Sequence, residues 1–226
     1  MIGIVSAMES EINKILEYVE DKKIKKILNI EFITGKIFSK DIVICISLEG
    51  KVNSTIATTL MINEFNIDNI INLGVAGSID LEVDIFDVVI SSSTTQHDYD
   101  LTMLGYDKGY VLGVDNIYNE CDSTLVMKLS NICRHKSIKY NIGNIASGDI
   151  FVASDYMKET IKSQYNSLAV DMESAAINHV CKLNNVKFCS VKVILDSGNK
   201  VEVRKFLDEA VSILTGVVLE FLKKEV

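Results

Sequence analysis

Residues 168–196 read LAVDMESAAINHVCKLNNVKFCSVKVILD, and this stretch carries the pattern that decides the fold. A short apolar run at 168–170 is followed by a segment of helical period that starts at Glu173, and then by a longer apolar run at 188–194. Runs that are apolar on both faces are typical of buried strands, so the order predicts a strand–helix–strand unit. A right-handed crossover in such a unit brings Glu173 and Asp196 to the same rim of a sheet.

The same alternation extends over the rest of the chain. Strands are predicted at 2–6, 31–37, 42–47, 69–73, 86–91, 142–146, 168–170 and 188–194, and helices at 8–19, 52–66, 123–134, 154–164, 173–183 and 203–222. Alternating strands and helices predict an α/β fold with three layers, α/β/α. The runs at 31–37 and 42–47 are joined by a tight turn near Ser39, which requires antiparallel neighbours, so the central sheet is expected to be mixed.

Length and composition limit the function classes. The chain has 226 residues, 48% of them apolar, which suits one domain spanning residues 1–226. It carries 23 basic against 31 acidic residues, and its arginines are Arg134 and Arg204, so no basic stripe is expected to bind nucleic acid or an anionic membrane. Five cysteines without CxxC spacing indicate a reducing compartment, and no apolar run approaches the roughly 20 residues of a membrane span. We expect a soluble cytoplasmic protein.

Acidic residues follow several of the predicted strands, at the edge where open α/β sheets bind ligands. The turns concerned read SAMESE at 6–11, GVAG at 74–77, SGDIF at 147–151, DME at 171–173 and DSGN at 196–199. None of these turns contains a lysine or an arginine. The rim is therefore expected to be acidic.

Glu173 lies on the apolar stripe of its helix with Ala176 and Ile177, so its carboxylate is expected to face the core. It could be an ordinary first-turn glutamate favoured by the helix dipole. Asp171, however, already supplies a cap for that helix. The redundancy and the inward position favour a functional role for Glu173.

The other rim acids each have a structural alternative. Ser6 and Glu9 fit a capping box, which explains Glu9 but leaves Glu11 either on the surface or in a site. Asp196 could form an Asx-turn with the Ser-Gly-Asn that follows it. Two acids brought together in a partly apolar cleft titrate apart, one keeping a proton and one ionised, which suits cleavage of a bond to an anomeric carbon.

Taken in order, several motifs resemble those of bacterial 5′-methylthioadenosine/S-adenosylhomocysteine nucleosidases, within the nucleoside phosphorylase/hydrolase superfamily. The motifs are IGI at 2–4 with AMESE at 7–11, GKV at 50–52, INLGVAG at 71–77, HDYD at 97–100 with GY at 105–106, SGDIF at 147–151, DMESAA at 171–176 and LD at 195–196. The resemblance implies hydrolysis of the N-glycosidic bond of methylthioadenosine, adenosylhomocysteine or 5′-deoxyadenosine. It also implies a nucleoside phosphorylase/hydrolase-like fold, no cofactor, no metal ion and a place in methionine salvage.

By this resemblance three acids are catalytic. Asp196 would protonate adenine N7 as the general acid, Glu11 would orient or deprotonate the attacking water, and Glu173 would hold the ribose hydroxyls and stabilise an oxocarbenium-like transition state. Glycosidases divide the same work between an acid for the leaving group and a carboxylate for the sugar or the water.

The resemblance also implies a substrate pocket, with Phe151 stacked on the purine and Val152 hydrogen-bonded to its edge through the main chain. Met8 and Met172 would pack on the ribose, near Val75. In the homodimer that the family suggests, Leu101 and Leu104 would complete the neighbour's pocket, and Phe206 or Val203 would cover the ribose. The chain departs from the family pattern at Val75, Leu104, Lys192 and Leu195, where a hydroxyl residue, an aromatic, an arginine and a serine are common.

Three other functions stay open. A nucleoside phosphorylase on the same fold would need cations to hold phosphate, and the rim turns lack them. A nucleoside-binding paralogue without turnover is suggested by the altered pocket residues. A metal-dependent ribohydrolase would use the acids as ligands, but no aspartate-rich run occurs and chelators are expected to have no effect.

Overall fold

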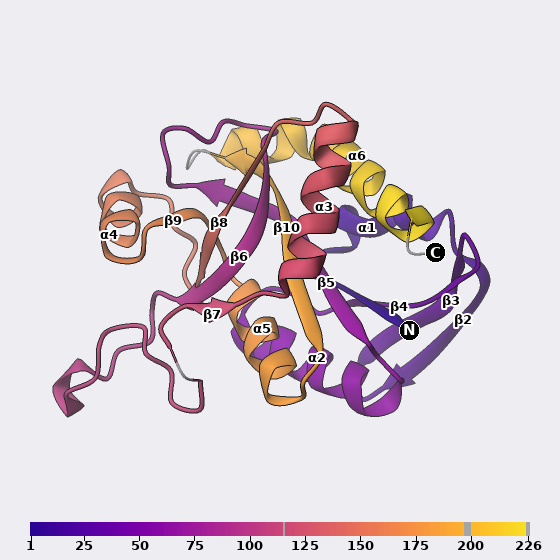
Figure 1. The fold of residues 1–226 in the computed structure, drawn as a ribbon, viewed down its shortest axis with the longest axis horizontal. Coiled ribbons are helices and arrows are strands. Elements are labelled where there is room, and N and C mark those ends of the chain that lie inside the picture. Colours follow the sequence, from indigo (N-terminus) through magenta and orange to yellow (C-terminus); the bar gives the residue numbers. More distant parts are fainter. Residues whose placement is uncertain (115, 197–199, 225–226) are drawn as a thin grey trace.

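The computed structural model describes residues 1–114, 116–196 and 200–224, with the backbone alone at 196 and 200–204. The strands are β1 (Ile2–Ser6), β2 (Glu20–Ile27), β3 (Ile30–Ile37), β4 (Lys40–Ile46), β5 (Asn69–Ser78), β6 (Val88–Gln96), β7 (Asn119–Glu120), β8 (Tyr140–Ser147), β9 (Ser167–Asp171) and β10 (Lys187–Asp196). The helices are α1 (Glu9–Leu16), α2 (Lys51–Glu64), η1 (Thr102–Leu104), α3 (Ser123–His135), α4 (Asp155–Tyr165), α5 (Ser174–Leu183) and α6 (Lys200–Lys224). They surround one large sheet (Figure 1).

The sheet is mixed, as predicted, and its strand order is β10-β6-β8-β9-β5-β1-β4-β3-β2. An additional pairing of β10 with β5 closes part of the sheet into a ring of five strands: β5, β10, β6, β8 and β9. Strand β1 pairs in parallel with both β4 and β5, while β3 and β4 form the predicted antiparallel hairpin. Its two-residue turn consists of Phe38 and Ser39, both at positive φ (50° and 67°), a backbone twist that matches the twist of the strands.

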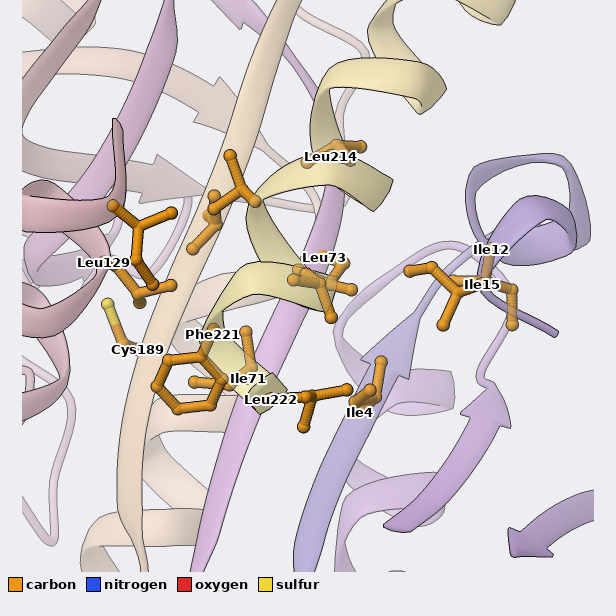
Figure 2. Packing of buried hydrophobic residues seen from close by; sticks show 14 of the residues in the cluster. Ile4, Ile12, Ile15, Ile71, Leu73, Leu129, Cys189, Leu214, Phe221 and Leu222 are labelled. Atoms are coloured by element: carbon orange, nitrogen blue, oxygen red, sulfur yellow. The ribbon is translucent and has the colours of Figure 1, made fainter. Parts of the chain in front are cut away.

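Side chains alternate between two apolar layers along the central strands. Ile4 of β1 and Ile44 of β4 point into the core beneath α1, α3 and α6, whereas Val5 and Val43 point into the core beneath α2 and α5. Figure 2 shows the first of these cores, where Phe221 and Leu222 of α6 lie over the strands. Because successive strand residues face opposite sides, runs apolar at every position produce the predicted α/β/α layering.

The first prediction for residues 168–196 is wrong in its topology. Strand β9 pairs antiparallel with β5, whereas β10 pairs parallel with β5, so β9 and β10 run in opposite directions and do not form a parallel β-α-β unit. The predicted meeting at one rim nevertheless occurs, because Gly77 near the end of β5 is paired with Val170 on one side and with the backbone of Asp196 on the other.

Two further differences concern strand boundaries. Strand β2 was not predicted, because its sequence EDKKIKKI is mostly charged and exposed, as suits a lysine-protected edge strand. Strand β5 continues through Gly74–Gly77, which we predicted as a turn, so that Val75 lies within a strand.

The five cysteines are free, and burial raises the pKa of Cys45 to about 12, so this thiol behaves as an apolar core group.

Candidate active site

A pocket of about 240 Å³ opens at the rim where β1, β5 and β9 end. Its lining includes seven of the predicted site residues: Met8, Glu11, Val75, Phe151, Val152, Met172 and Glu173. The remaining lining residues are Ala7, Glu49, Ala76, Gly77, Ile150, Val170 and Asp171. A largely apolar pocket with a few convergent polar groups is the usual form of a small-molecule site.

A larger groove of about 1090 Å³ lies between residues 78–85 and α4. Five acids line it, Asp80, Glu82, Asp84, Asp155 and Glu159, and of these Asp80 and Asp84 are ion-paired with Lys162 and Lys139, respectively. Among residues with described side chains, no predicted site residue lines this groove. Volume alone therefore does not identify the site, and the smaller pocket contains the convergent carboxylates.

Glu11 lies in the first turn of α1 and is buried, with 2% of its surface exposed, so the alternative that it is a surface residue is wrong. Its Oε2 accepts hydrogen bonds from the Ser6 hydroxyl (2.6 Å) and the Met8 amide (3.0 Å), and Oε1 accepts the Val75 amide (2.9 Å). The helix cap is Met8 with Glu11 at the third position, so the capping box predicted from Ser6 and Glu9 is also wrong. Three donors fix the orientation of the Glu11 carboxylate.

Glu173 immediately precedes α5 and is 5% exposed. Its Oε1 accepts the main-chain N–H of Gly50 at 3.0 Å, and its Oε2 lies 4.0 Å from the Lys192 ammonium. Burial raises the pKa of Glu173 to about 7, and the negative charges of Asp171 and Glu11 act in the same direction. Glu173 therefore changes its charge near neutral pH.

Sequence reasoning named Lys192 as a departure from the family pattern but gave it no role in the site. It projects from the apolar strand β10, is fully buried, and its ammonium lies 3.0 Å from Asp171 Oδ2. Burial alone would lower the pKa of Lys192, but the carboxylates of Asp171, Glu173 and Glu11 outweigh it and raise the pKa. The rim thus contains a cation that comes from a strand, although the rim turns contain no lysine or arginine. The sequence feature that could have indicated it is the single lysine within the apolar run at 188–194.

The Asp171 carboxylate contacts both the start of α5 and the Lys192 ammonium. The N-cap position of α5 is Glu173, so the prediction of Asp171 as the N-cap residue is wrong, although the Asp171 carboxylate accepts the main-chain N–H of Ser174, the first residue of α5, at 3.2 Å. It also accepts the hydroxyls of Ser147 and Ser174 and pairs with Lys192. Burial opposes ionisation, but Lys192 and these hydroxyls hold the pKa of Asp171 below its usual range. Asp171, in the pocket lining, and Lys192 together form a buried ion pair with no net charge.

The remaining predicted residues are distributed as follows. The backbone of Asp196 ends β10 beside Gly77, and its side chain lies outside the described residues, as does that of Val203. Phe206 packs edge-on against Phe86, with ring centroids 5.2 Å apart, and is not among the lining residues. Leu101 and Leu104 lie on the segment around η1, which projects from the body of the molecule, and Leu104 is exposed (Figure 1).

Comparisons with known proteins agree with this geometry. A sequence model described as the phosphorylase superfamily matches residues 1–223. The 5′-methylthioadenosine/S-adenosylhomocysteine nucleosidase of Staphylococcus carnosus is 36% identical over 227 residues, covering 99% of each chain.

Solved structures show the same fold. The S-adenosylhomocysteine nucleosidase of Streptococcus pyogenes, in complex with 5-methylthiotubericidin, has a TM-score of 0.95 at 29% identity and covers 100% of this chain and 97% of its own. A futalosine hydrolase mutant of Helicobacter pylori has a TM-score of 0.94 at 30% identity, covering 100% and 99%. The chain therefore belongs to the phosphorylase superfamily and, within it, to the 5′-methylthioadenosine/S-adenosylhomocysteine nucleosidases, a family of enzymes that hydrolyse N-ribosides.

Proposed function

We propose that this protein hydrolyses the N-glycosidic bond of 5′-methylthioadenosine and S-adenosylhomocysteine, releasing adenine and the 5′-substituted ribose. The observation that carries the proposal is the pair of buried carboxylates, Glu11 and Glu173, on the wall of one largely apolar pocket. The names of the relatives support the same substrates. The futalosine hydrolase among the similar structures makes the 5′-substituent the property to test first.

Glu11 is proposed to hold the attacking water. A carboxylate has about four lone-pair positions, and three of those on Glu11 are taken by Ser6, Met8 and Val75. The free position belongs to Oε1, which accepts only the Val75 amide among its described partners. A water bound there is oriented by a carboxylate whose own orientation is fixed by three hydrogen bonds.

Glu173 is proposed to hold the ribose hydroxyls and to stabilise positive charge that develops on the sugar. One of its oxygens is occupied by the Gly50 amide, which leaves acceptor positions for hydroxyl groups. The apolar surroundings strengthen the interaction of its ionised form with an oxocarbenium-like transition state.

Asp196 is proposed to protonate adenine N7 as the general acid. The support is its place at the end of β10, beside Gly77 in the pocket wall. A leaving base needs a proton on the side opposite the attacking water, which matches the division of labour in glycosidases.

The pocket walls are assigned by the same reasoning. Phe151 is 49% exposed although aromatic, as a ring that stacks on a purine would be before the ligand binds. The main chain of Val152 would bind the purine edge, and Met8 and Met172 would contact the ribose. Phe206, which packs against Phe86 and is not among the lining residues, is the proposed cover for the ribose.

We further propose a cytoplasmic homodimer that acts in methionine salvage. Leu101 and Leu104 of one protomer would complete the 5′-substituent pocket of the other, which is consistent with the exposure of Leu104. Within the described residues no helix is long and apolar enough to cross a membrane. The free cysteines support a reducing compartment.

An assay that measures release of the free purine base from each nucleoside tests the activity. Purified enzyme is incubated with methylthioadenosine, adenosylhomocysteine, 5′-deoxyadenosine or futalosine, each with and without inorganic phosphate. Release of adenine from the first two without phosphate is expected, and Asp196→Asn should abolish it while leaving nucleoside binding nearly intact.

Two outcomes would overturn the hydrolase assignment. A strict phosphate requirement with formation of ribose 1-phosphate would indicate a phosphorylase, for which Lys192 is the cation to examine, although Asp171 already pairs with it. Binding of nucleoside without any base release by the wild type would indicate a non-catalytic paralogue.

A further inference from the structure

Three motifs of the sequence meet beside the pocket without a role in the proposed chemistry: Gly50-Lys51, Asp98 and Asp149. The Lys51 ammonium lies 2.7 Å from Asp98 Oδ1 and 3.2 Å from the side-chain oxygen of Gln96. Asp98 Oδ2 accepts the main-chain N–H of Asp149 at 2.9 Å, and Asp149 Oδ1 accepts the main-chain N–H of Lys51 at 2.7 Å. We call Lys51, Asp98 and Asp149, which form this closed ring of contacts, the Lys51 clasp.

The clasp holds the start of α2, where the helix lacks a cap of its own. The N-cap residue is Gly50, which has no side chain to accept the free amides of the first turn. Asp149 accepts one of these amides from a segment 98 positions away in the sequence. The carboxylate of Asp149 is therefore a cap supplied by another part of the chain.

Gly50 adopts a backbone conformation that directs its amide to Glu173. Its φ of 97° and ψ of 159° are accessible to glycine, and a Cβ added there would lie 3.0 Å from Asp149 Oδ1. The N–H of Gly50 points to Glu173 Oε1 (3.0 Å), and the next amide, that of Lys51, points to Asp149. Asp149 thus holds one of the two peptide planes that flank the Gly50 Cα, and Glu173 contacts the other.

The Lys51–Asp98 pair is protected from solvent more than the surface ion pairs of this protein. The two side chains are 17% and 16% exposed, against 51% and 41% for Lys25 and Glu64. Burial would raise the pKa of Asp98, but the Lys51 ammonium and the Asp149 amide outweigh it and lower the pKa. The Asp98 carboxylate is therefore ionised at neutral pH, and its 2.7 Å contact with the Lys51 Nζ suits the role of a rigid anchor.

We propose that the Lys51 clasp is a set of positioning residues for Glu173, because it holds the Gly50 amide against that carboxylate. The inference rests on the role proposed above for Glu173. None of its three members is among the residues that line the pocket, and the main-chain N–H of Gly50, next to Lys51, is the group that contacts Glu173.

Loss of the clasp has two expected consequences. Without its fixed amide donor the Glu173 carboxylate is less well oriented, and loss of a hydrogen bond to a charged group corresponds to a decrease in kcat/KM of about tenfold or more. The Gly50 N–H also favours the ionised form of Glu173, so its loss raises the pKa of Glu173. The acid limb of the kcat/KM profile should then move up by about one pH unit.

Other charged groups near Glu173 also affect its pKa. The described groups that face it are Lys192 from β10, Asp171 from β9, Glu11 from α1 and the exposed Glu49 at the pocket rim. None of these is changed in the variants below. Asp149→Ala is the decisive variant, because removal of a nearby negative charge alone would lower the pKa of Glu173, whereas loss of positioning raises it.

The experiment measures kcat, KM and the pH profile of adenine release for Asp149→Ala, Asp149→Asn, Lys51→Met and Lys51→Arg. Asp149→Ala and Lys51→Met should lower kcat/KM about tenfold and move the acid limb upward. Asp149→Asn keeps an acceptor for the Lys51 amide and Lys51→Arg keeps the cation, so both should stay within about threefold of the wild type. Asp149 is exposed, so its variants should fold even if Lys51→Met does not.

Two controls separate the possible failures. Glu64→Gln removes an ion pair at the other end of the same helix and should leave the rate and the profile unchanged. Glu173→Gln should lower kcat/KM by more than any clasp variant; an unaffected Glu173→Gln would refute the role of Glu173 itself. If Glu173→Gln is impaired but Asp149→Ala has a normal rate, or an acid limb moved downward, the clasp is not a positioning device.

Discussion

Replacing Lys192 by methionine removes the ammonium group that faces Asp171 and Glu173 while keeping a side chain of similar length. In the wild type this ammonium lies 3.0 Å from Asp171 and 4.0 Å from Glu173, and all three groups are buried. The variant leaves two buried carboxylates without their cation. Each must then either stay charged at a high desolvation cost or take up a proton.

The loss of unfolding free energy in Lys192→Met depends on whether the two carboxylates stay charged or take up a proton. Breaking a buried ion pair by removing one partner costs about 3–5 kcal/mol. In the wild type the lowered pKa of Asp171 contributes stability above the unfolded pKa, and this contribution is lost as the pH falls through the folded pKa. In Lys192→Met burial is no longer opposed by the cation, so the pKa of Asp171 rises and that of Glu173 rises further. The destabilisation should therefore be largest near pH 8 and shrink to about 1 kcal/mol or less near pH 4.

Urea unfolding of the wild type and Lys192→Met at pH 4, 6 and 8 measures this difference. Lys139→Met is the matched control, since Lys139 also contacts two aspartates, Asp84 and Asp87, but is 57% exposed. This control should lose less than about 1 kcal/mol. A loss for Lys192→Met that is the same at all three pH values, or below that of the control, would refute the electrostatic account of this site.

Three further outcomes are expected. The kcat/KM for adenine release should fall below about pH 7, because the ionised Glu173 is required and burial raises its pKa to about 7; a profile that stays flat down to about pH 5 contradicts this assignment. Glu173→Gln should stabilise the protein by about 1–2 kcal/mol at pH 8 and by nothing at pH 4, because a carboxyl whose folded pKa is raised costs stability above its unfolded pKa; equal gains at both pH values would point to packing. Phe221→Ala, in the core shown in Figure 2, should cost about 3–5 kcal/mol in urea unfolding, whereas Tyr156→Ala, 78% exposed, should cost less than about 0.5 kcal/mol.

The fold could be predicted as far as its signals are local. The runs at 2–6 and 42–47 are apolar on both faces, and both lie between two helical layers in the structure. Strand β2 carried no such signal, because its pairing with β3 occurs at an exposed edge where charged residues are tolerated. The direction of β9 could not be read from residues 168–196 either, because it depends on the pairing of Val170 with Gly77, far away in the sequence.

The candidate site divides in the same way. Glu11 and Glu173 could be selected because each is an acid next to an apolar pattern, and both line the pocket. Lys192 could not be assigned to the site, because the role of a lysine in an apolar strand cannot be inferred without knowing which side chain it pairs with. That partner, Asp171, was interpreted as a helix cap alone.

The sequence by itself determined the layer order and the acids at the rim, since periodicity and residue type are properties of neighbouring residues along the chain. Only the tertiary structure decided which buried acid has a lowered pKa and which has a raised pKa. Against the effect of burial, Lys192 and two serine hydroxyls lower the pKa of Asp171, whereas burial raises the pKa of Glu173 against the opposing effects of Lys192 and the Gly50 N–H. Charge interactions act through space over a few ångströms, and the residues that meet there come from β10, α2 and β9, which only folding brings together.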